Sequence, residues 1–443
     1  MSQTIAVKTA SHLDVLTEKI ANRTARVGIV GLGYVGLPLA VEFAKAGFSV
    51  TGIDALESKV ARINAGDSYI QDINRDEVSS LVEAGKLRAT TDFSVIAELD
   101  TLNICVPTPL RKTKDPDMSY IVAACQEIAK YFRAGSLVIL ESTTYPGTTA
   151  ELVLPILAGS GAEVGRDFFL CFSPERVDPG NPKYQTRNIP KVVGGLTPAC
   201  TQMGKLFYSQ ALQTVIPVSS TQVAEMVKLL ENTFRMINIG LVNEMAMMCT
   251  RMGIDIWEVI DAAATKPFGF MPFYPGPGLG GHCIPIDPFY LSWKSRQDGM
   301  EARFIELAGY INGQMPHFVV DKVQNALNDH SKALKGSKIH ILGVAYKRDI
   351  EDVRESPALD IMHLLKLRGA DVTFSDPYVP SVRIEDNISF STDLFSSVQS
   401  ADCVVIITDH SSVDYASVVN EARLIVDTRN ALKSIVSPKI VRL

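Results

Sequence analysis

Short apolar runs and longer amphipathic stretches alternate along the first half of the chain. An apolar run at Val27–Val30 is followed by a turn and by a stretch with helical periodicity at Leu37–Ala46. Gly47 ends this stretch, and a second apolar run occupies Ser49–Ile53. This order predicts two parallel strands joined by a helix. Further strands are expected at Thr101–Val106, Ser136–Leu140, Phe168–Phe172 and Lys191–Val193, so the region to about residue 215 is predicted to be one doubly wound domain.

One long helix is expected from about Ser220 to Met252. This stretch contains no Pro and a single Gly, and its apolar residues recur at spacings of three and four, at Val223, Met226, Val227, Leu230, Phe234 and Ile237. Such spacing places these side chains on one face of a helix. A helix of this length is predicted to connect two domains, and it offers a surface for a dimer.

The pattern of the first domain returns after Ser337. A strand is predicted at Lys338–Leu342 and a helix at Pro357–Arg368. The run Gly369–Asp376 then parallels the run Gly47–Asp54, although shared βαβ geometry alone can produce such a parallel. The predicted fold class is α/β, with two Rossmann-like doubly wound domains joined by a long central helix and a helical segment.

These patterns divide the chain into four predicted parts. An N-terminal extension covers residues 1–24, a nucleotide-binding domain 25–218, a central helical domain 219–330 and a second nucleotide-binding-type domain 331–443. A short helix is expected near Ser11–Ala21, and the sequence assigns it no role.

Composition narrows the class of protein. The formal net charge of −6 over 443 residues argues against a nucleic-acid surface, so an anionic ligand would be held by local Lys, Arg and helix N-termini. The seven cysteines are scattered and form no CxxC pair, which is typical of a reducing compartment. The first residues do not show a basic stretch followed by a long apolar run. No apolar segment approaches the ~20 residues that span a bilayer. We expect a soluble, cytoplasmic protein that binds a small anion.

A glycine-rich turn lies between the first predicted strand and helix, with the sequence Gly31-Leu32-Gly33-Tyr34-Val35-Gly36. In this position the glycines permit a tight turn, close approach of a pyrophosphate and close packing of helix on strand, and the phosphates meet the helix N-terminus. Asp54 at the end of the next strand can accept hydrogen bonds from a ribose diol and would repel a 2′-phosphate. The pattern predicts NAD in preference to NADP, with a ligand-free turn as the alternative.

The stretch Pro272–Pro288 is too rich in Gly and Pro to be predicted as helix or strand. It holds one thiol, Cys283, and a carboxylate four residues later, Asp287. Glycines let backbone approach a ligand and prolines stiffen a loop, so the stretch is predicted to be functional, with a structural turn around a buried thiol as the alternative. His282 has no His or Cys partner at metal-ligand spacing, so no metal site is predicted.

Lys228 and Asn232 are four residues apart on the long predicted helix, where they share a face with Glu231 and Arg235. Such a stripe is often the solvated side of a helix. A helix also holds two polar heads more rigidly than a loop does, as the stabilisation of an oxyanion requires. Both interpretations stay open on the spacing alone.

Polar segments follow predicted strands in both domains. Glu141–Gly147 and Ser173–Arg176 lie in the first domain, at positions where open α/β sheets bind ligands. Tyr346–Asp349 and Arg354–Pro357 lie in the last domain, and their basic residues are suited to hold a diphosphate. Taken singly, each segment is equally explained by ordinary loop polarity.

In this order, the segments closely resemble the nucleotide-sugar 6-dehydrogenases, the UDP-glucose/UDP-N-acetylhexosamine dehydrogenase family. From about Arg26 to the C-terminus, the chain carries the family's Gly-Gly-x-Cys-x-Pro-x-Asp-Pro loop, Lys-x-x-x-Asn helix, and Ser-Pro-Glu, Tyr-Lys-Arg-Asp and Arg-Glu-Ser-Pro segments. The resemblance implies a four-electron oxidation of a sugar C6 hydroxyl to a carboxylate, with two NAD molecules in turn and no metal. It also implies a UDP-sugar as partner and a homodimer or larger homo-oligomer.

The resemblance assigns roles to individual residues. Cys283 would form a thiohemiacetal and then a thioester with the sugar, and Lys228 and Asn232 would steady the oxyanion. Asp287, Thr143 and Glu175 would order or deprotonate water. The implied cofactor contacts are Gly31, Gly33, Tyr34, Val35, Asp54, Lys59, Thr108, Thr143 and Arg354. The implied substrate contacts are Glu175, Arg176, Lys228, Asn232, Phe273, Tyr274, Gly280 and Lys347.

Two residues beside the nucleophile bear on the identity of the sugar. Family members that act on UDP-glucose tend to carry Ser before the nucleophile and Lys before the aspartate, whereas this chain has His282 and Ile286. The run resembles most the UDP-N-acetylglucosamine branch, with the UDP-ManNAc and UDP-GalNAc branches close to it. The expected substrate is UDP-GlcNAc and the expected product UDP-N-acetylglucosaminuronate, a precursor of polysaccharide and lipopolysaccharide sugars.

Two other functions remain alternatives. A two-electron dehydrogenase of the hydroxyacid type has the same domain order and needs no cysteine. A catalytically silent nucleotide-sugar sensor would keep both binding domains, although the complete set of Cys283, Lys228, Asn232 and Asp287 argues against it.

Overall fold

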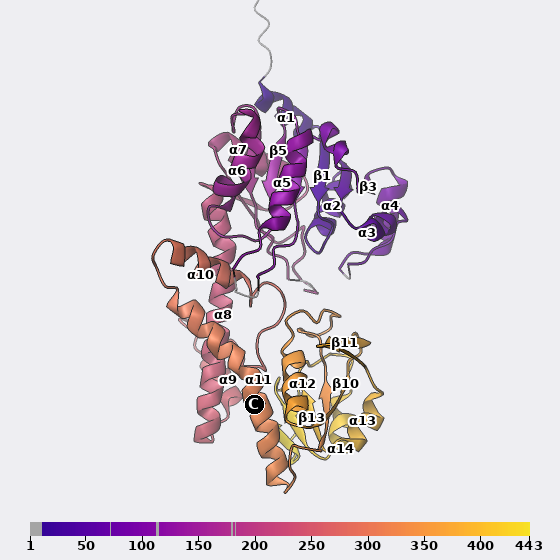
Figure 1. Cartoon of the computed structure of the whole chain (residues 1–443), viewed down its shortest axis with the longest axis vertical. Coiled ribbons are helices and arrows are strands. Elements are labelled where there is room, and N and C mark those ends of the chain that lie inside the picture. The colour runs from indigo at the N-terminus through magenta and orange to yellow at the C-terminus, as the bar shows by residue number, and fades with distance from the viewer. Residues whose placement is uncertain (1–10, 71, 112–114, 179, 182) are drawn as a thin grey trace, which may run out of the picture. The chain divides into compact units, whose positions relative to one another are not determined.

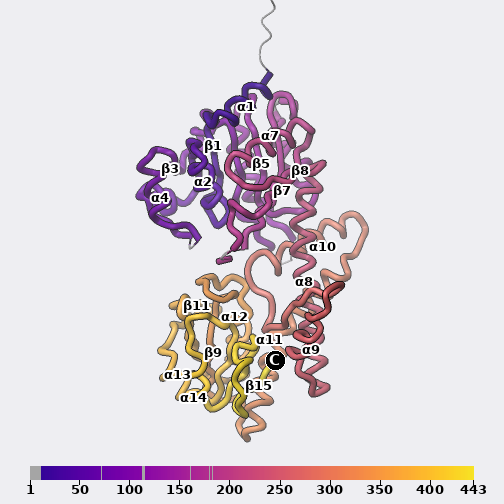
Figure 2. Tube along the Cα trace, turned by 180° about the vertical axis from the view of Figure 1, so that it is seen from behind, coloured from indigo at the N-terminus to yellow at the C-terminus, as the bar shows by residue number. Residues whose placement is uncertain are grey.

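The computed structural model describes residues 11–70, 72–111, 115–178, 180–181 and 183–443 (Figures 1 and 2). The chain forms two compact units, the first ending at Leu230 and the second running from Glu231 to Leu443. Each is built on its own parallel sheet, which confirms the predicted α/β class. Residues 1–10 of the expected N-terminal extension lie outside the described residues, and the four-part division of the chain stays a prediction.

An eight-stranded sheet organises the first unit, in the order β3-β2-β1-β4-β5-β6-β7-β8. The strands are β1 (Arg26–Val30), β2 (Ser49–Ile53), β3 (Leu87–Thr90), β4 (Thr101–Ile104), β5 (Leu137–Leu140), β6 (Phe169–Phe172), β7 (Lys191–Gly195) and β8 (Val215–Val218). All neighbours are parallel except β6 and β7. A parallel neighbour would need a crossover, usually a helix, and the described residues between β6 and β7 contain none.

Helices cover both faces of this sheet. Side chains of α1 (His12–Ala21), α2 (Gly36–Lys45) and α7 (Pro198–Tyr208) form one core cluster with Val27 and Ile29 of β1. Val30 of the same strand belongs to a second cluster with α5 (Ser119–Tyr131), which lies over the near face in Figure 1. The remaining helices are α3 (Glu57–Asn64), α4 (Arg75–Glu83), η1 (Phe93–Glu98), η2 (Thr149–Val153), α6 (Leu154–Leu157) and η3 (Ala158–Ser160). Because strands buried on both faces need apolar residues at every position, the continuous apolar runs in the sequence mark them well.

The long helix α8 (Thr221–Met252) begins in the first unit and continues into the second. The second unit also contains α9 (Ile256–Ala263), α10 (Asp287–Gln297) and α11 (Arg303–Asp329). Its five strands are all parallel, in the order β10-β9-β13-β14-β15. They are β9 (Lys338–Leu342), β10 (Asp371–Ser375), β13 (Cys403–Ile406), β14 (Ile425–Asp427) and β15 (Ile440–Arg442).

Helices also cover both faces of the second sheet. Residues of α11 and α12 (Pro357–Leu367) share a core cluster with β9, whereas α13 (Leu394–Ser400) and α14 (Tyr415–Glu421) share another with β13 and β14. A separate antiparallel pair is formed by β11 (Ser381–Ile384) and β12 (Asn387–Phe390).

The stretch Pro272–Pro288 differs from its prediction at one end. It is irregular up to Ile286, but Asp287 and Pro288 are the first residues of helix α10. Proline is well tolerated in a first helical turn because the N–H that it lacks has no partner there, and an acidic side chain at this end favours the helix dipole. Asp287 therefore lies on a helix rather than in an irregular loop.

Two features are absent from the residues that the structure describes. No described helix is long and apolar enough to cross a membrane. Within the same residues, no group of three or more His, Cys, Asp and Glu side chains is placed to hold a metal ion.

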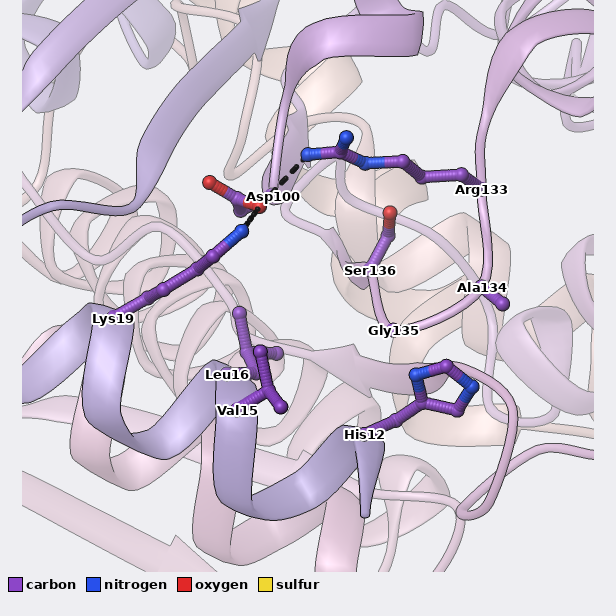
Figure 3. A pocket seen from close by; sticks show the side chains of 9 residues that line it. All are labelled: His12, Val15, Leu16, Lys19, Asp100, Arg133, Ala134, Gly135 and Ser136. Atoms are coloured by element: carbon purple, nitrogen blue, oxygen red, sulfur yellow. Dashed lines mark hydrogen bonds and ion pairs between the residues drawn. The ribbon is translucent and has the colours of Figure 1, made fainter. Parts of the chain in front are cut away.

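The short helix predicted near Ser11–Ala21 is α1, and it belongs to the core of the first unit. Leu16 and Ile20 are buried in the cluster that α1 shares with α2 and α7. Lys19 Nζ and an Arg133 guanidinium nitrogen both donate to Asp100 Oδ1, at 2.7 and 2.9 Å (Figure 3). Lys19, Asp100 and Arg133 are among the residues that line a pocket of about 210 Å³. This helix is thus held to the sheet by burial and by a shared carboxylate.

A substitution at Leu16 tests this packing. Leu16→Ala leaves a cavity under α1 and is expected to lower the free energy of unfolding by about 2–5 kcal/mol. Val15→Ala on the exposed side of the same helix is the matched control and should cost less than about 0.5 kcal/mol. Denaturant unfolding of both variants measures the difference, and equal effects would show that α1 is not part of the core.

Candidate active site

Three glycines shape the turn after β1, each in a different way. Gly31 has φ +93°, and a Cβ there would meet the Cys105 carbonyl oxygen at 2.6 Å. A Cβ on Gly36 would meet the Gly31 carbonyl oxygen at 1.9 Å. A Cβ on Gly33 would meet nothing within 4 Å. The first and third glycines are therefore required by the fold, while the second leaves open the space that a pyrophosphate would take at the start of α2.

Asp54 closes this turn from the end of β2. Its Oδ2 accepts from Leu32 N at 2.9 Å and from Lys59 Nζ at 3.2 Å, and its Oδ1 accepts from Leu56 N at 3.0 Å. Lys59, one of the implied cofactor contacts, thus lies against the predicted cofactor carboxylate. Tyr69 was missed by the sequence analysis; its hydroxyl donates to Leu32 O at 2.6 Å, and no motif marks it.

The turn lies where the order of the sheet reverses, with β2 on one side of β1 and β4 on the other. Thr108 and Thr143 follow β4 and β5, the next strands along the same edge. Ser142 Oγ donates to Val106 O at 2.7 Å and joins these two loops. Tyr34 and Val35 are half-buried within the turn itself. All predicted cofactor residues of the first unit therefore gather at the carboxyl edge of its sheet, where such sheets bind ligands.

The loop after β5 is fastened to helix α8. Lys228 Nζ donates to Thr143 Oγ1 at 2.5 Å. One turn earlier, the Glu225 carboxylate accepts from Gly147 N at 2.6 Å and from Thr149 N at 2.9 Å. Burial raises the pKa of Glu225, and these donors partly offset that effect. Glu225 was missed, although its position three residues before Lys228 on the same helix face was a usable signal.

Glu175 follows β6, and its Oε1 accepts from the backbone N–H groups of Arg176 and Val177, each at 2.8 Å. Its Oε2 lies 3.2 Å from Lys191 Nζ. The Arg176 guanidinium donates to Pro190 O at 2.6 Å. Glu175 and Arg176 thus belong to one ordered loop in which the carboxylate has a buried cation beside it.

In the second unit, Asn232 Nδ2 donates to Asp287 Oδ2 at 2.7 Å, so two predicted catalytic residues are in contact. Cys283 lies four residues before Asp287, and its carbonyl accepts from Ile286 N and Asp287 N at 3.1 and 2.7 Å. All seven cysteines fall within the described residues, and six are buried; Cys283 alone is partly exposed. The interpretation of this loop as a turn around a buried thiol is wrong for Cys283.

The cysteine loop packs against the Tyr346–Asp349 and Arg354–Pro357 segments. Gly281 N donates to Arg354 O at 3.0 Å. A Cβ on Gly280 would lie 2.6 Å from Tyr346 Cβ, and one on Gly281 would lie 2.9 Å from the Tyr346 ring. Gly280 and the segments that carry Lys347 and Arg354 are therefore neighbours because glycine permits the approach. The Arg354 side chain donates to Asp352 Oδ2 at 2.6 Å.

Two buried asparagines hold the beginning of the same loop. Gly276 N donates to Asn243 Oδ1 at 2.9 Å, and Asn243 Nδ2 donates to Asn312 Oδ1 at 2.8 Å. These residues lie on α8 and α11, and both are buried. Sequence analysis missed them, although an Asn inside a mostly apolar helix face is a signal because a buried amide needs a partner.

Phe273 and Tyr274 pack beside α8 and α9. The Phe273 and Phe234 rings meet edge to face with centroids 5.7 Å apart, and the Tyr274 ring stacks on Trp257 at 6.1 Å. Their predicted role as substrate contacts stays a prediction, and their contacts in this structure fix the loop that precedes Cys283.

The second sheet repeats the geometry of the first. Gly343 after β9 has φ +81°, and a Cβ there would meet Thr408 O at 2.2 Å. Asp376 follows β10, and its Oδ2 accepts from Val344 N and Ala345 N at 2.7 and 3.1 Å. This is the arrangement of Gly31 and Asp54, so the parallel seen in the sequence corresponds to the same turn.

Arg429 is a half-buried cation near this edge that no sequence motif marked. It follows β14, and its Nε donates to Ile407 O at 2.9 Å. A Cβ on Gly276 would lie 2.6 Å from one of its guanidinium nitrogens. Burial lowers the pKa of Arg429 to about 10, with the charge of Arg348 contributing. Arg429 is still protonated at neutral pH, so a positive charge is available beside the cysteine loop.

Three successive parts of the chain match the domains of one family. Residues 25–212 match the NAD binding domain of the UDP-glucose/GDP-mannose dehydrogenase family, residues 222–314 its central domain, and residues 340–434 its UDP binding domain. The chain therefore belongs to the UDP-glucose/GDP-mannose dehydrogenase family.

Individual relatives and structures agree with this assignment. The chain is 35% identical over 424 residues to UDP-N-acetyl-D-mannosamine dehydrogenase of Salmonella typhimurium, covering 91% of this chain and 98% of that protein. It is 36% identical over 356 residues to UDP-N-acetyl-D-glucosamine 6-dehydrogenase of Pseudomonas aeruginosa, covering 80% and 83%. The solved structure of the UDP-D-ManNAc dehydrogenase of Pyrococcus horikoshii superposes with a TM-score of 0.85 at 33% identity, over 94% of this chain and 98% of that one.

The family places the chain in a class of enzymes. It is an NAD-dependent dehydrogenase of a UDP-sugar, and its cofactor is NAD. The turn around Gly33 fits this cofactor, because it presents open space at a helix N-terminus and a carboxylate at the end of the next strand.

Paired glycine substitutions separate cofactor binding from folding. Gly33→Ala fills the open space and is expected to weaken NAD binding by about tenfold or more, which is about 1.4 kcal/mol, while the melting temperature stays close to that of the native protein. Gly36→Ala drives a methyl group into backbone and should cost about 3 kcal/mol of stability. Calorimetric titration with NAD and thermal unfolding measure the two effects; unchanged NAD affinity in Gly33→Ala would contradict the site.

Proposed function

We propose that the enzyme oxidises the C6 hydroxyl of a UDP-N-acetylhexosamine to the carboxylate in two successive oxidations, the second through an adduct on one nucleophilic cysteine. The observation that carries the proposal is the partial exposure of Cys283, while the other six cysteines are buried. Its backbone carbonyl also accepts from Asp287 N at the start of α10. The neighbouring pair Asn232 and Asp287 supports it, since an amide and a carboxylate beside a thiol suit oxyanion binding and water activation.

The proposed roles follow the chemistry of an aldehyde. NAD, when bound, accepts a hydride in each of the two oxidations. Between them, the Cys283 thiolate adds to the C6 aldehyde, forming a carbon–sulfur bond, and the resulting thiohemiacetal is oxidised to a thioester. Water then hydrolyses the thioester and returns the thiol. Lys228 and Asn232 steady the oxyanions, and Asp287, Thr143 and Glu175 order or deprotonate the water.

The remaining predicted contacts concern the nucleotide. Lys347, Arg176, Phe273, Tyr274 and Gly280 are proposed to bind the UDP-sugar, and Arg354 to assist the cofactor. Arg429, a half-buried cation beside Gly276, adds a candidate partner for the diphosphate.

UDP-GlcNAc is the proposed substrate. His282 and Ile286 beside the nucleophile favour an N-acetylhexosamine over glucose, as does the similarity to a relative named UDP-N-acetyl-D-glucosamine 6-dehydrogenase. UDP-ManNAc is a second candidate, because relatives named for that sugar match the chain at 35% identity over a larger share of its length. The product would be a uronate for surface polysaccharide or lipopolysaccharide.

A substrate panel tests the proposal. UDP-GlcNAc, UDP-ManNAc, UDP-GalNAc and UDP-Glc are each supplied with NAD, and NADH is counted per sugar consumed. UDP-GlcNAc is expected to give the highest kcat/KM, with two NADH per sugar. A preference for UDP-ManNAc would correct the sugar while keeping the reaction, and a preference for UDP-Glc would overturn the substrate class. One NADH per sugar would indicate a two-electron dehydrogenase.

The role of Cys283 is tested by removing it. Cys283→Ser is expected to lower turnover to the carboxylate by at least about a thousandfold, because an alcohol is a far weaker nucleophile and its ester is hydrolysed more slowly. Cys249→Ala removes a buried thiol of the same unit and should retain activity. Asp287→Asn should accumulate a sugar adduct on Cys283 that mass spectrometry detects. Full activity of Cys283→Ser would exclude the covalent route.

A homodimer or larger homo-oligomer stays a prediction. Large apolar side chains on α8 and α11 of the second unit are exposed, among them Leu241, Met248, Met252, Phe304, Leu307 and Tyr310. Monomeric proteins rarely expose so many on neighbouring elements, which favours coverage by a second copy of this chain.

A further inference from the structure

Behind Glu175 lies a group of buried polar side chains to which no role has been assigned. Lys191 at the start of β7 donates from Nζ to Glu141 Oε2 at 2.6 Å and to Glu175 Oε2 at 3.2 Å. Of these side chains, Lys191 is 2% exposed, Glu141 0% and Glu175 9%. One ammonium group is therefore shared by two carboxylates in a site that water hardly reaches.

Glu141 holds Lys191 at a shorter distance than Glu175 does. Its Oε1 accepts from Asn103 Nδ2 at 2.7 Å and from the Tyr208 hydroxyl at 2.6 Å, while its Oε2 takes the shorter bond of Lys191. Glu175 Oε1 accepts from two backbone N–H groups, and its Oε2 takes the longer bond of Lys191. Glu141 is therefore the closer partner of Lys191. Its negative charge offsets part of the positive charge that Lys191 presents to Glu175.

The charged and titratable groups near Glu175 come from several elements. They are Lys191 on β7, Glu141 after β5, Cys105 after β4, Tyr208 on α7 and Arg176 on its own loop. Burial raises the pKa values of the Cys105 thiol and of the Tyr208 hydroxyl, so both stay neutral near pH 7. Lys191 is then the one buried cation that contacts the Glu175 carboxylate among the described residues.

We propose that Lys191 is a positioning residue that keeps the Glu175 carboxylate ionised and oriented for its work on water, and that Glu141 limits how strongly it does so. The inference rests on the proposed function of Glu175. Burial alone would raise the pKa of this carboxyl group, but Lys191 and the N–H groups of Arg176 and Val177 together hold it below its usual value. With Lys191 present, Glu175 is ionised throughout the neutral range. Without it, burial and the charge of Glu141 both favour the protonated acid.

The test is the pH profile of kcat/KM for NADH formation from the UDP-sugar. Lys191→Met is expected to move the acid limb upward by about one pH unit or more, because a carboxylate loses an opposite charge within hydrogen-bonding distance. Lys191→Arg keeps the charge and should leave the acid limb near that of the native enzyme. Glu141→Gln breaks the same buried ion pair from the other side, yet should leave the limb in place or move it lower.

This comparison distinguishes an electrostatic role from a structural one. If the pair served only the stability of the sheet, Lys191→Met and Glu141→Gln would lower the melting temperature and the activity alike, with no upward shift peculiar to Lys191→Met. That outcome, or an upward shift in both, would overturn the inference. Should Lys191→Met not fold, the double variant with Glu141→Gln removes both charges of the pair, and its acid limb should still lie above that of Glu141→Gln alone.

A second measurement does not depend on turnover. In infrared difference spectra, Lys191→Met should show a protonated carboxyl band at about pH 6 that is absent from the native enzyme and disappears when Glu175→Gln is added. Absence of that band would contradict the proposal. A native enzyme that forms no NADH with any UDP-sugar would refute the proposed function instead, so the two failures are distinct.

Discussion

Two hydrogen bonds made by side chains of helix α8 fix the segments that carry predicted catalytic residues. Lys228 and Asn232 are four residues apart on this helix, which sets their heads on one face about 6 Å apart along its axis. Each is fastened within its own unit, Lys228 to Thr143 after β5 and Asn232 to Asp287 at the start of α10.

The nucleotide sites depend on a simpler device that the chain uses twice. A carboxylate at the end of the second strand, Asp54 or Asp376, accepts N–H groups from the turn after the first strand. The glycine that opens that turn, Gly31 or Gly343, lies so close to a carbonyl just after the neighbouring strand that a Cβ would collide with it. The runs Gly47–Asp54 and Gly369–Asp376 resemble one another because each leads into the same backbone arrangement.

Burial gives the polar residues of the first unit their chemical character. Lys191 is charged within the sheet's core because two carboxylates surround it, and Glu175 remains a carboxylate because that cation is beside it. In water such a contact would be worth little, but in a site of low dielectric constant it decides which form of the acid exists. Burying these three charges costs free energy of desolvation. An apolar residue could support the sheet without that cost, so a purely structural role does not account for Lys191.

Much of the architecture followed from local pattern. Runs such as Val27–Val30 and Lys338–Leu342 are apolar at nearly every position because their strands are buried on both faces, and the uninterrupted periodicity from Ser220 to Met252 has no other solution than a long helix. The glycine turn and the cysteine loop could be predicted because Gly permits backbone angles that other residues avoid and Pro fixes its own φ angle. The antiparallel pair of β6 and β7 was not visible, because strand direction depends on the path of the connection.

What the sequence determined, then, was the class of fold, the cofactor turn and the identity of the single thiol in a glycine-rich loop. Only the tertiary structure decided that Cys283 is the partly exposed cysteine, that Asp287 begins a helix in contact with Asn232, and that Glu225, Glu141, Lys191, Asn243 and Arg429 support the site. The physical reason is distance along the chain. Lys191 and Glu141 are fifty residues apart, and no local rule of spacing relates two side chains that meet only when separate strands pack into one sheet.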